Sequence, residues 1–216
     1  MPIARERVLE AVKKAREQAG KRKFVQSIDL MLGFKGLDLN KPENRITVEV
    51  PLPHGTGKSL KVLMFAEGEL ARRAKEAGAD LVMGQKEIEA LAGDRKKAKE
   101  IVEAHDAFLA QADMMPLIGK QLGPVLAPRG KMPKPVPLSA DPKPLIERSR
   151  GIARINVRTQ PVVHMLVGRE DMSDDQLADN IEAILRAVES RLPRGLRQLK
   201  SVYLKTTMGK PVRIEV

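Results

Sequence analysis

Alternation of apolar and polar residues occurs near both ends of this chain and is lost in the middle. Residues 24–32, 44–50, 154–158 and 201–207 each alternate, which predicts strands with one buried and one exposed face. Between 59 and 153, short apolar runs are separated by helical stretches, as in the βαβ units of a mostly parallel sheet. We therefore expect an α/β protein whose two ends fold together around an inserted middle domain.

Apolar residues recur at helical spacing in several places, including two runs between 84 and 105. The other expected helices are 3–19, 68–77 and 174–190. Further strands are expected at 61–66, 81–83, 106–110 and 161–168. Residues 122–137 contain five prolines and two glycines, too many for regular structure, so an ordered loop or an extended arm is expected there.

The positive charge of the chain is concentrated at its two ends. The formal net charge is +11, from 39 Lys and Arg against 28 Asp and Glu. Residues 1–23 hold eight basic and three acidic residues (+5), and residues 186–216 hold eight basic and two acidic residues (+6), so the middle is neutral. This favours a basic terminal domain that binds an anionic partner such as RNA. The alternative is a generally basic protein with solvated charged faces.

Composition also limits the classes of protein to which the chain can belong. The absence of cysteine excludes disulfides, thiol catalysis and cysteine-based metal sites, and it fits a reducing cytoplasm. No apolar run approaches the roughly 20 residues that span a bilayer, and the N-terminus does not resemble a secretory signal, so a soluble cytoplasmic protein is expected. Aromatic residues make up 2% of the chain, too few for a base-stacking platform.

The last alternating strand carries hydrogen-bond donors on one face. Ser201, Tyr203, Lys205 and Thr207 alternate with other residues and so share one surface. Gly209 breaks the strand and lets a partner approach the bare backbone. This face is suited to an anionic partner.

One short motif points to a different function. Gly55-Thr-Gly-Lys-Ser59 is similar to the end of a P-loop, but that motif needs a glycine where Leu52 stands and a helix where a strand follows. A nucleotide-binding α/β enzyme using Gly55–Ser59 is therefore kept as the alternative. His54, His105 and His164 lack metal-ligand spacing, and His105 is expected to be solvated. We expect no catalytic group, no metal and no cofactor.

Four segments in this order resemble the ribosomal protein L-one family in its shorter archaeal-type form. They are 23–24, 52–58, 122–133 and 201–211. The resemblance covers nearly the whole chain. It implies a discontinuous rRNA-binding domain I (1–58 and 154–216), an α+β body with a split βαβ-like sheet. It also implies an inserted Rossmann-like three-layer α/β domain II (59–153).

The same resemblance implies a function without catalysis. The chain would be a structural constituent of the large ribosomal subunit that binds rRNA to form the mobile stalk. It would assist release of deacylated tRNA from the E site, and it would repress translation of its own mRNA at a similar RNA site. A cytoplasmic protein that is monomeric when free of the ribosome, with no membrane partner, is implied as well.

Carried over by position, the resemblance implies RNA contacts mainly on the first and last strands. They are Lys23, Phe24, Ser27, Asp29, Arg158, His164, Ser201, Lys205, Thr206, Thr207, Met208 and Gly209. Hydroxyls would bond 2′-OH groups and phosphates, and Met208 with Phe24 would contact riboses or a base. For Asp29, a direct bond to RNA and the orientation of Lys23 or Lys205 both stay open.

Three basic residues in the proline-rich segment have two interpretations. Arg129, Lys131 and Lys134 either form a second contact with RNA or tRNA or belong to a rigid loop that packs the inserted domain.

Overall fold

The computed structural model describes residues 4–20, 22–37, 39, 44–157 and 159–215. Two compact units are present: unit 1 comprises Met1–Lys58 with Gly151–Val216, and unit 2 comprises Ser59–Arg150. The second boundary lies three residues before the expected one, because Ile152 and Ala153 already pair with residues of unit 1.

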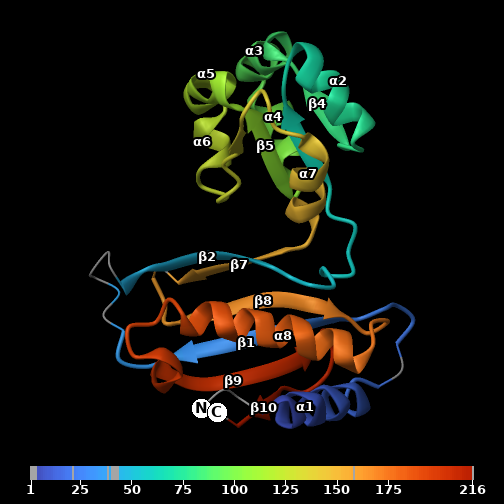
Figure 1. The fold of residues 1–216 in the computed structure, drawn as a ribbon, viewed down its shortest axis with the longest axis vertical. Helices are drawn as coiled ribbons and strands as arrows, with labels where there is room; N and C mark the ends of the chain where they lie inside the picture. Colours follow the sequence, from blue (N-terminus) through green and yellow to red (C-terminus); the bar gives the residue numbers. More distant parts are fainter. Residues whose placement is uncertain (1–3, 21, 38, 40–43, 158, 216) are drawn as a thin grey trace. The chain divides into compact units, whose positions relative to one another are not determined.

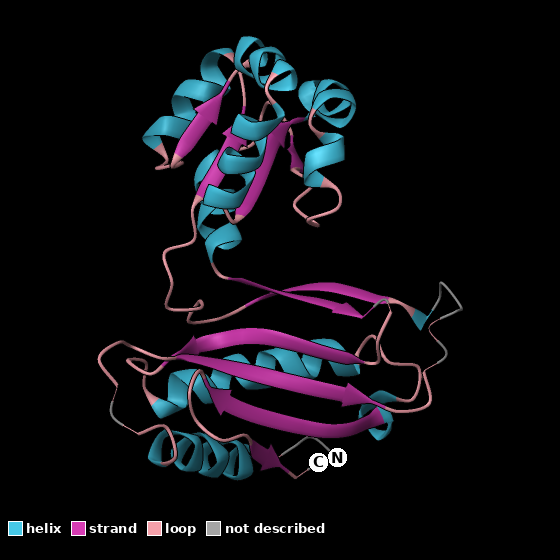
Figure 2. Ribbon diagram, turned by 180° about the vertical axis from the view of Figure 1, so that it is seen from behind, coloured by secondary structure: helices cyan, strands magenta, loops and turns pink. Residues whose placement is uncertain are grey.

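Unit 1 is built on a four-stranded antiparallel sheet in the order β10-β9-β1-β8. The strands are β1 (Ser27–Phe34), β8 (Val162–Arg169), β9 (Leu199–Thr206) and β10 (Val212–Ile214). Helices α1 (Arg5–Glu17) and α8 (Asp174–Glu189) pack on this sheet, and Figure 1 shows α8 in front of β1. In Figure 2, seen from behind, the strands lie in front of α8, so the opposite face of the sheet carries no helix.

Alternation along the strands fixes which face is covered. Ile28, Leu30 and Leu32 of β1 are fully buried and pack in one core with residues of both helices, such as Val12 and Ile181. Burial of each such side chain stabilises the fold by about 1.5–3 kcal/mol. The residues between them on β1 are half-buried and belong to the helix-free face.

A separate strand pair completes unit 1. β2 (Ile46–Pro51) pairs antiparallel with β7 (Ile152–Val157) over the full length of both strands. The loop after β2 is held to α8 by Asn180, whose amide donates to Gly55 O at 2.8 Å and to Val167 O at 2.9 Å. Because Asn180 is fully buried, these bonds satisfy groups that water cannot reach.

Unit 2 is a three-layer α/β fold. Its parallel sheet has the order β4-β3-β5-β6, with β3 (Val62–Phe65), β4 (Leu81–Met83), β5 (Ala107–Gln111) and β6 (Lys134–Val136). One face packs against α2 (Gly68–Glu76) and α7 (Pro142–Arg150). The other packs against α3 (Gln85–Gly93), α4 (Arg95–Ala104), α5 (Met115–Gln121) and α6 (Gly123–Leu126). The expected α/β fold class is confirmed.

The main error of the sequence analysis concerns residues 122–137. This segment holds the short helix α6 and the strand β6, not an irregular arm. Pro124 lies in the first turn of α6, where its missing N–H costs nothing, and Pro135 lies on an edge strand. Among the described residues, no helix is both long and apolar enough to cross a bilayer.

Candidate nucleic-acid interface

The helix-free face of the unit 1 sheet brings together residues from three strands. Met31 of β1 lies opposite Tyr203 of β9 on one side and opposite His164 of β8 on the other. Asp29 lies opposite Lys205 in the same way. Directly paired residues share a face, so the expected polar row on β9 is confirmed as one surface with the polar residues of β1.

The position of the Ser201 side chain on this face depends on the residue opposite it. It lies opposite Gly33, and a Cβ on Gly33 would come within 2.7 Å of the Ser201 hydroxyl oxygen. Glycine at position 33 therefore leaves the room in which the Ser201 hydroxyl sits. The sequence alone does not indicate this role of Gly33, because a glycine within a strand has several explanations.

At one end of the sheet, the turn after β9 is tied to the start of β1. Thr207 N donates to Ser27 O at 3.0 Å, and Ser27 N donates to the Thr207 hydroxyl oxygen at 3.0 Å. That hydroxyl also donates to Ser27 O at 3.3 Å. The Thr207 hydroxyl was expected to bond RNA. In the structure it bonds the Ser27 backbone and so extends the β1–β9 pairing by one more residue pair.

Gln26 organises the same end of the sheet from inside. Its side chain is fully buried, and its Oε1 accepts from Met208 N at 3.1 Å while its Nε2 donates to Gly20 O at 3.4 Å. Its backbone exchanges bonds with Glu170, whose N donates to Gln26 O at 2.9 Å. Gln26 therefore links three segments: its side-chain amide joins the end of α1 to the turn after β9, and its backbone joins them to the end of β8.

The sequence contained a signal for Gln26 that was not used. Gln26 has the same parity as the buried Ile28, so alternation places it on the covered side of the sheet. A buried amide must find partners, and the free backbone groups of neighbouring turns are the natural ones.

Two of the expected RNA contacts have other roles. Thr206 is fully buried, so its side chain does not reach a partner on the surface. Gly209 is also buried, and a Cβ there would clash with the Thr206 hydroxyl oxygen and lie 3.3 Å from Ala19 Cα. The expectation that Gly209 is bare so that RNA can approach it is wrong: the chain's own packing requires the glycine.

Apolar side chains are exposed at this end of the sheet. Phe24 is 53% exposed, Val25 45% and Met208 57%, the last on the turn that Gln26 anchors. Phe24 and Val25 line a shallow hollow of about 350 Å³, together with the basic residues Arg22 and Lys23 and the acidic residues Glu170 and Asp171. We give the name sheet-end interface to the exposed Lys23, Phe24, Thr207 and Met208 together with the half-buried Ser27.

Asp29 lies in the middle of a group of cations. Burial raises the pKa of its carboxyl, and the positive charges of Lys58, Lys205 and His164 oppose that rise. Of the two cations that Asp29 was expected to orient, Lys205 is thus a close electrostatic neighbour. Lys58, from the loop after β2, was not foreseen.

The remaining expected contacts lie elsewhere. Arg158 falls outside the described residues. In unit 2, the Lys131 ammonium donates to Val102 O at 2.8 Å and to His105 O at 2.6 Å, so it closes the C-terminal end of α4. Arg129 pairs with Glu103 at 2.6 Å. These contacts favour the packing interpretation for both residues, and Lys134 lies in β6.

The alternative nucleotide site does not have the geometry of a P-loop. No helix follows residues 55–59, which lead instead to β3. Gly55 O accepts from Asn180, and Gly57 O accepts from Arg169 at 3.2 Å, so this loop is committed to packing within unit 1. The segment is a structural turn.

The histidines show no shared site. His105 is buried, with Nδ1 2.8 Å from Ile101 O, so the expectation that it is solvated is wrong. His54 Nε2 lies 3.0 Å from Asp179 Oδ2, next to the Arg5–Asp179 ion pair of 2.6 Å. Within the described ranges, no three His, Cys, Asp or Glu residues are grouped so as to hold a metal ion.

Known proteins resemble this chain over almost its entire length. The protein named large ribosomal subunit protein uL1 of Methanothermobacter thermautotrophicus is 52% identical over 207 residues, 96% of this chain and 98% of the relative. The protein of the same name from Methanothermococcus thermolithotrophicus is 52% identical over 211 residues, 98% and 99% of the two chains. That from Methanopyrus kandleri is 46% identical over 214 residues, 99% and 100%.

These relatives carry the name of a structural ribosomal component, which confirms the prediction that the chain is not an enzyme. The family described as the Ribosomal protein L1p/L10e family matches residues 12–210. This match includes β1, β8 and β9 of the unit 1 sheet, the residues of the sheet-end interface and all of unit 2. The chain therefore belongs to the Ribosomal protein L1p/L10e family.

Proposed function

We propose that this chain is a structural protein of the large ribosomal subunit, located in the cytoplasmic ribosome, that binds rRNA through unit 1. The observation that carries the proposal is the sheet-end interface, where exposed apolar and basic side chains stand on a backbone fixed by Gln26 and Ser27. Unit 1 is then the RNA-binding domain and unit 2 the inserted domain.

The physical basis is a preorganised, water-accessible edge. Phe24 and Met208 offer apolar contact to riboses or an exposed base. The Ser27 hydroxyl and the second lone pair of the Thr207 hydroxyl oxygen are available to 2′-OH groups. Lys23 and the basic segments supply the salt-dependent attraction to phosphates. Since the turn is already ordered, binding does not have to pay for ordering it.

We also propose two more specific roles, on the basis of the same family membership. By holding rRNA, the protein would help to form the mobile stalk and assist release of deacylated tRNA from the E site. Binding of a similar site in its own mRNA would repress its own translation. Both roles require that one surface recognises more than one RNA, as a surface that reads backbone shape can do.

The test is binding of the purified protein to a short rRNA stalk fragment across a salt series, with a scrambled hairpin of equal length as competitor. Site-specific recognition predicts tight binding at moderate salt that the scrambled hairpin does not displace. Binding that collapses with salt and treats both RNAs alike would reduce the sheet-end interface to a generic basic surface.

For the finer roles, the same assay uses deacylated tRNA with the protein–rRNA complex, and the 5′ region of the protein's own mRNA. Competition between the mRNA and the rRNA fragment for one site would support repression. Simultaneous binding of both, or no binding of the mRNA, would remove that role.

A further inference from the structure

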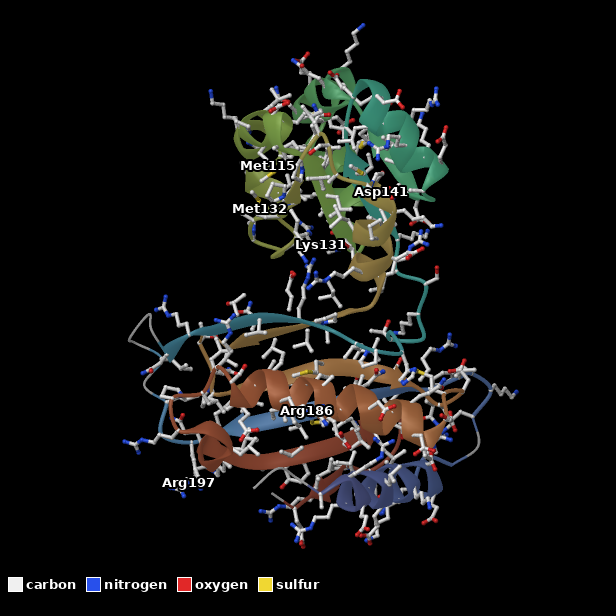
Figure 3. The ribbon with its side chains drawn as sticks, viewed as in Figure 1. Met115, Lys131, Met132, Asp141, Arg186 and Arg197 are labelled. Atoms are coloured by element: carbon white, nitrogen blue, oxygen red, sulfur yellow. The ribbon has the colours of Figure 1, made fainter. Side chains whose placement is uncertain are left out.

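A second basic surface lies on unit 1, in the turn that connects α8 to β9. It consists of Arg191, Arg194, Arg197 and Lys200, with Lys35 from the adjoining end of β1, and all five residues are exposed. We call it the arginine surface. Arg197 is seen at the end of unit 1 where β9 begins (Figure 3).

Within the part of the chain that the structure describes, no acidic side chain pairs with the cations of the arginine surface. Across the described ranges, none of its five residues forms an ion pair, and Glu189 is the one acidic residue between 186 and 200. The other basic segment of unit 1 behaves differently. There Arg5 pairs with Asp179 at 2.6 Å, and Arg16 pairs with Asp174 at 3.1 Å.

The backbone that presents these arginines is well anchored. Arg191 N donates to Val188 O at 3.0 Å, and Arg194 N donates to Gln198 Oε1 at 3.0 Å. Lys35 N donates to Gln198 O at 2.8 Å, which ties the end of β1 to the same turn. Gln198 and Leu192 are buried. The cations therefore project from an ordered frame and not from a loose tail.

The chemistry of the arginine surface selects phosphate. A planar guanidinium binds phosphate with two parallel hydrogen bonds and loses less hydration than an ammonium. No aromatic residue lies in the segment 186–200, so bases have no aromatic stacking platform there. The surface is thus suited to a sugar–phosphate backbone, read without sequence.

The position of the surface indicates which backbone. β9 runs over eight residues, from Leu199 beside the arginine surface to Thr206 beside the sheet-end interface. At about 3.3 Å per residue, the two regions lie roughly 20–25 Å apart on one rigid sheet. We propose that the arginine surface binds the phosphates of a second segment of the same RNA that the sheet-end interface recognises. This inference rests on the proposed function.

The experiment compares the parent with a triple variant, Arg191→Gln, Arg194→Gln and Arg197→Gln, on two RNAs. One is the minimal stalk fragment, and the other extends it by one helical turn on each arm. The triple variant is expected to bind the extended RNA about 10-fold to 100-fold more weakly at moderate salt. The slope of log K against log salt concentration should be less negative by about three, because each lost phosphate contact contributes about 0.9 to the slope. Affinity for the minimal fragment should be unchanged.

A control with the same change in charge separates position from net charge. The variant Arg95→Gln, Lys96→Gln and Lys99→Gln removes three exposed cations of α4 in unit 2, none of which pairs with an acidic residue among those that the structure describes. It should leave both affinities and the salt dependence as in the parent. Equal thermal unfolding of all three proteins checks that the folds are intact.

Three results would contradict the proposal. An unchanged salt dependence of the triple variant on the extended RNA would overturn it, and so would an equal loss in the α4 control. If the parent protein still binds the stalk fragment with specificity, these two results overturn only this inference. The proposed function then stands. Parent protein that does not distinguish the fragment from the scrambled hairpin overturns the proposed function and this inference with it.

Discussion

Two glycine-containing turns, 207–209 in unit 1 and 129–131 in unit 2, use their polar groups in different ways. Backbone and hydroxyl groups fix the first turn, while the Met208 side chain remains 57% exposed. In the second, the charged group itself is used, because the Lys131 ammonium bonds two carbonyls at the end of α4. A glycine-containing turn can serve as a binding site only where its side chains are not already bonded within the fold.

The largest expected effect concerns the turn 207–209, whose Met208 side chain is exposed. Met208→Asp should weaken binding of the stalk fragment about 100-fold, because it removes an apolar contact and places a carboxylate near phosphates. Thermal unfolding should be unchanged, since the side chain is exposed. Met132→Asp is the matched control, as Met132 is an exposed methionine (42%) of unit 2. RNA affinity is measured by filter binding. An equal loss of affinity in both variants would contradict the proposed difference between the two turns.

The second prediction tests the turn 129–131, whose lysine is bonded within unit 2. Lys131→Met should lower the free energy of unfolding by about 1–3 kcal/mol in urea denaturation, because Val102 O and His105 O lose a donor. RNA affinity should stay at the parent value. Lys99→Met changes an exposed lysine that has no ion pair within the described ranges, and it should leave stability unchanged. A loss of RNA affinity without loss of stability would make Lys131 a contact after all.

A third prediction concerns the anchor beneath the interface. Gln26→Met keeps the shape of a long unbranched side chain but removes the acceptor for Met208 N and the donor to Gly20 O. Affinity for the stalk fragment should fall about tenfold, equivalent to about 1.4 kcal/mol. The Met208 amide should also exchange its hydrogen faster.

The control for this variant is Gln18→Met, which changes an exposed glutamine at the end of α1. It should alter neither quantity. Unchanged exchange at Met208 together with weaker RNA binding would show that Gln26 acts in another way than by holding the turn.

The smallest expected effect is a pH dependence at Asp29. Because burial raises the folded-state pKa of this carboxyl, the folded protein binds its proton more tightly than the unfolded chain does. Its contribution to stability therefore falls as pH rises from the ordinary Asp range through the raised pKa. Asp29→Asn should be more stable than the parent at neutral pH. The advantage should vanish in acid, below the ordinary Asp pKa.

Thermal unfolding of both proteins across pH 3 to 8, in the range where carboxyls titrate, measures this difference. An advantage for Asp29→Asn that persists at the acid end would contradict burial as its cause. The His54–Asp179 pair is a useful internal reference. Arg5 and His54 lower the pKa of Asp179, so its contribution has the opposite sign and is lost as pH falls.

Local patterns were sufficient to predict most of the fold. Alternation placed Ile28, Leu30 and Leu32 inside, and the apolar stripe with its acidic start placed α8, whose Ser173 and Gln176 form a capping box. These features depend on neighbours in sequence, so sequence alone reveals them.

The elements that were missed depend on distant partners or on proline. β10 has three residues and is a strand only because it pairs with β9. α5 and α7 begin with prolines that resemble helix breakers but occupy first turns, where proline is tolerated.

For the candidate site, sequence predicted the exposed residues better than the buried ones. Phe24 and Met208 are exposed as expected, just before β1 and just after β9, and Ser27 is the first residue of β1; their contact with RNA stays a prediction. The burial of Thr206 and the packing of Gly209 against Ala19 could not be predicted, because they arise where α1 ends against the turn. Tertiary contact decided their roles.

The most direct test of the central claim is ultraviolet crosslinking of the protein to the stalk fragment, followed by mass spectrometry of the crosslinked peptides. The account predicts crosslinks in residues 22–29 and 201–209, with Phe24 and Met208 among the crosslinked positions. Crosslinks confined to residues 59–150, with none at the end of the unit 1 sheet, would contradict it.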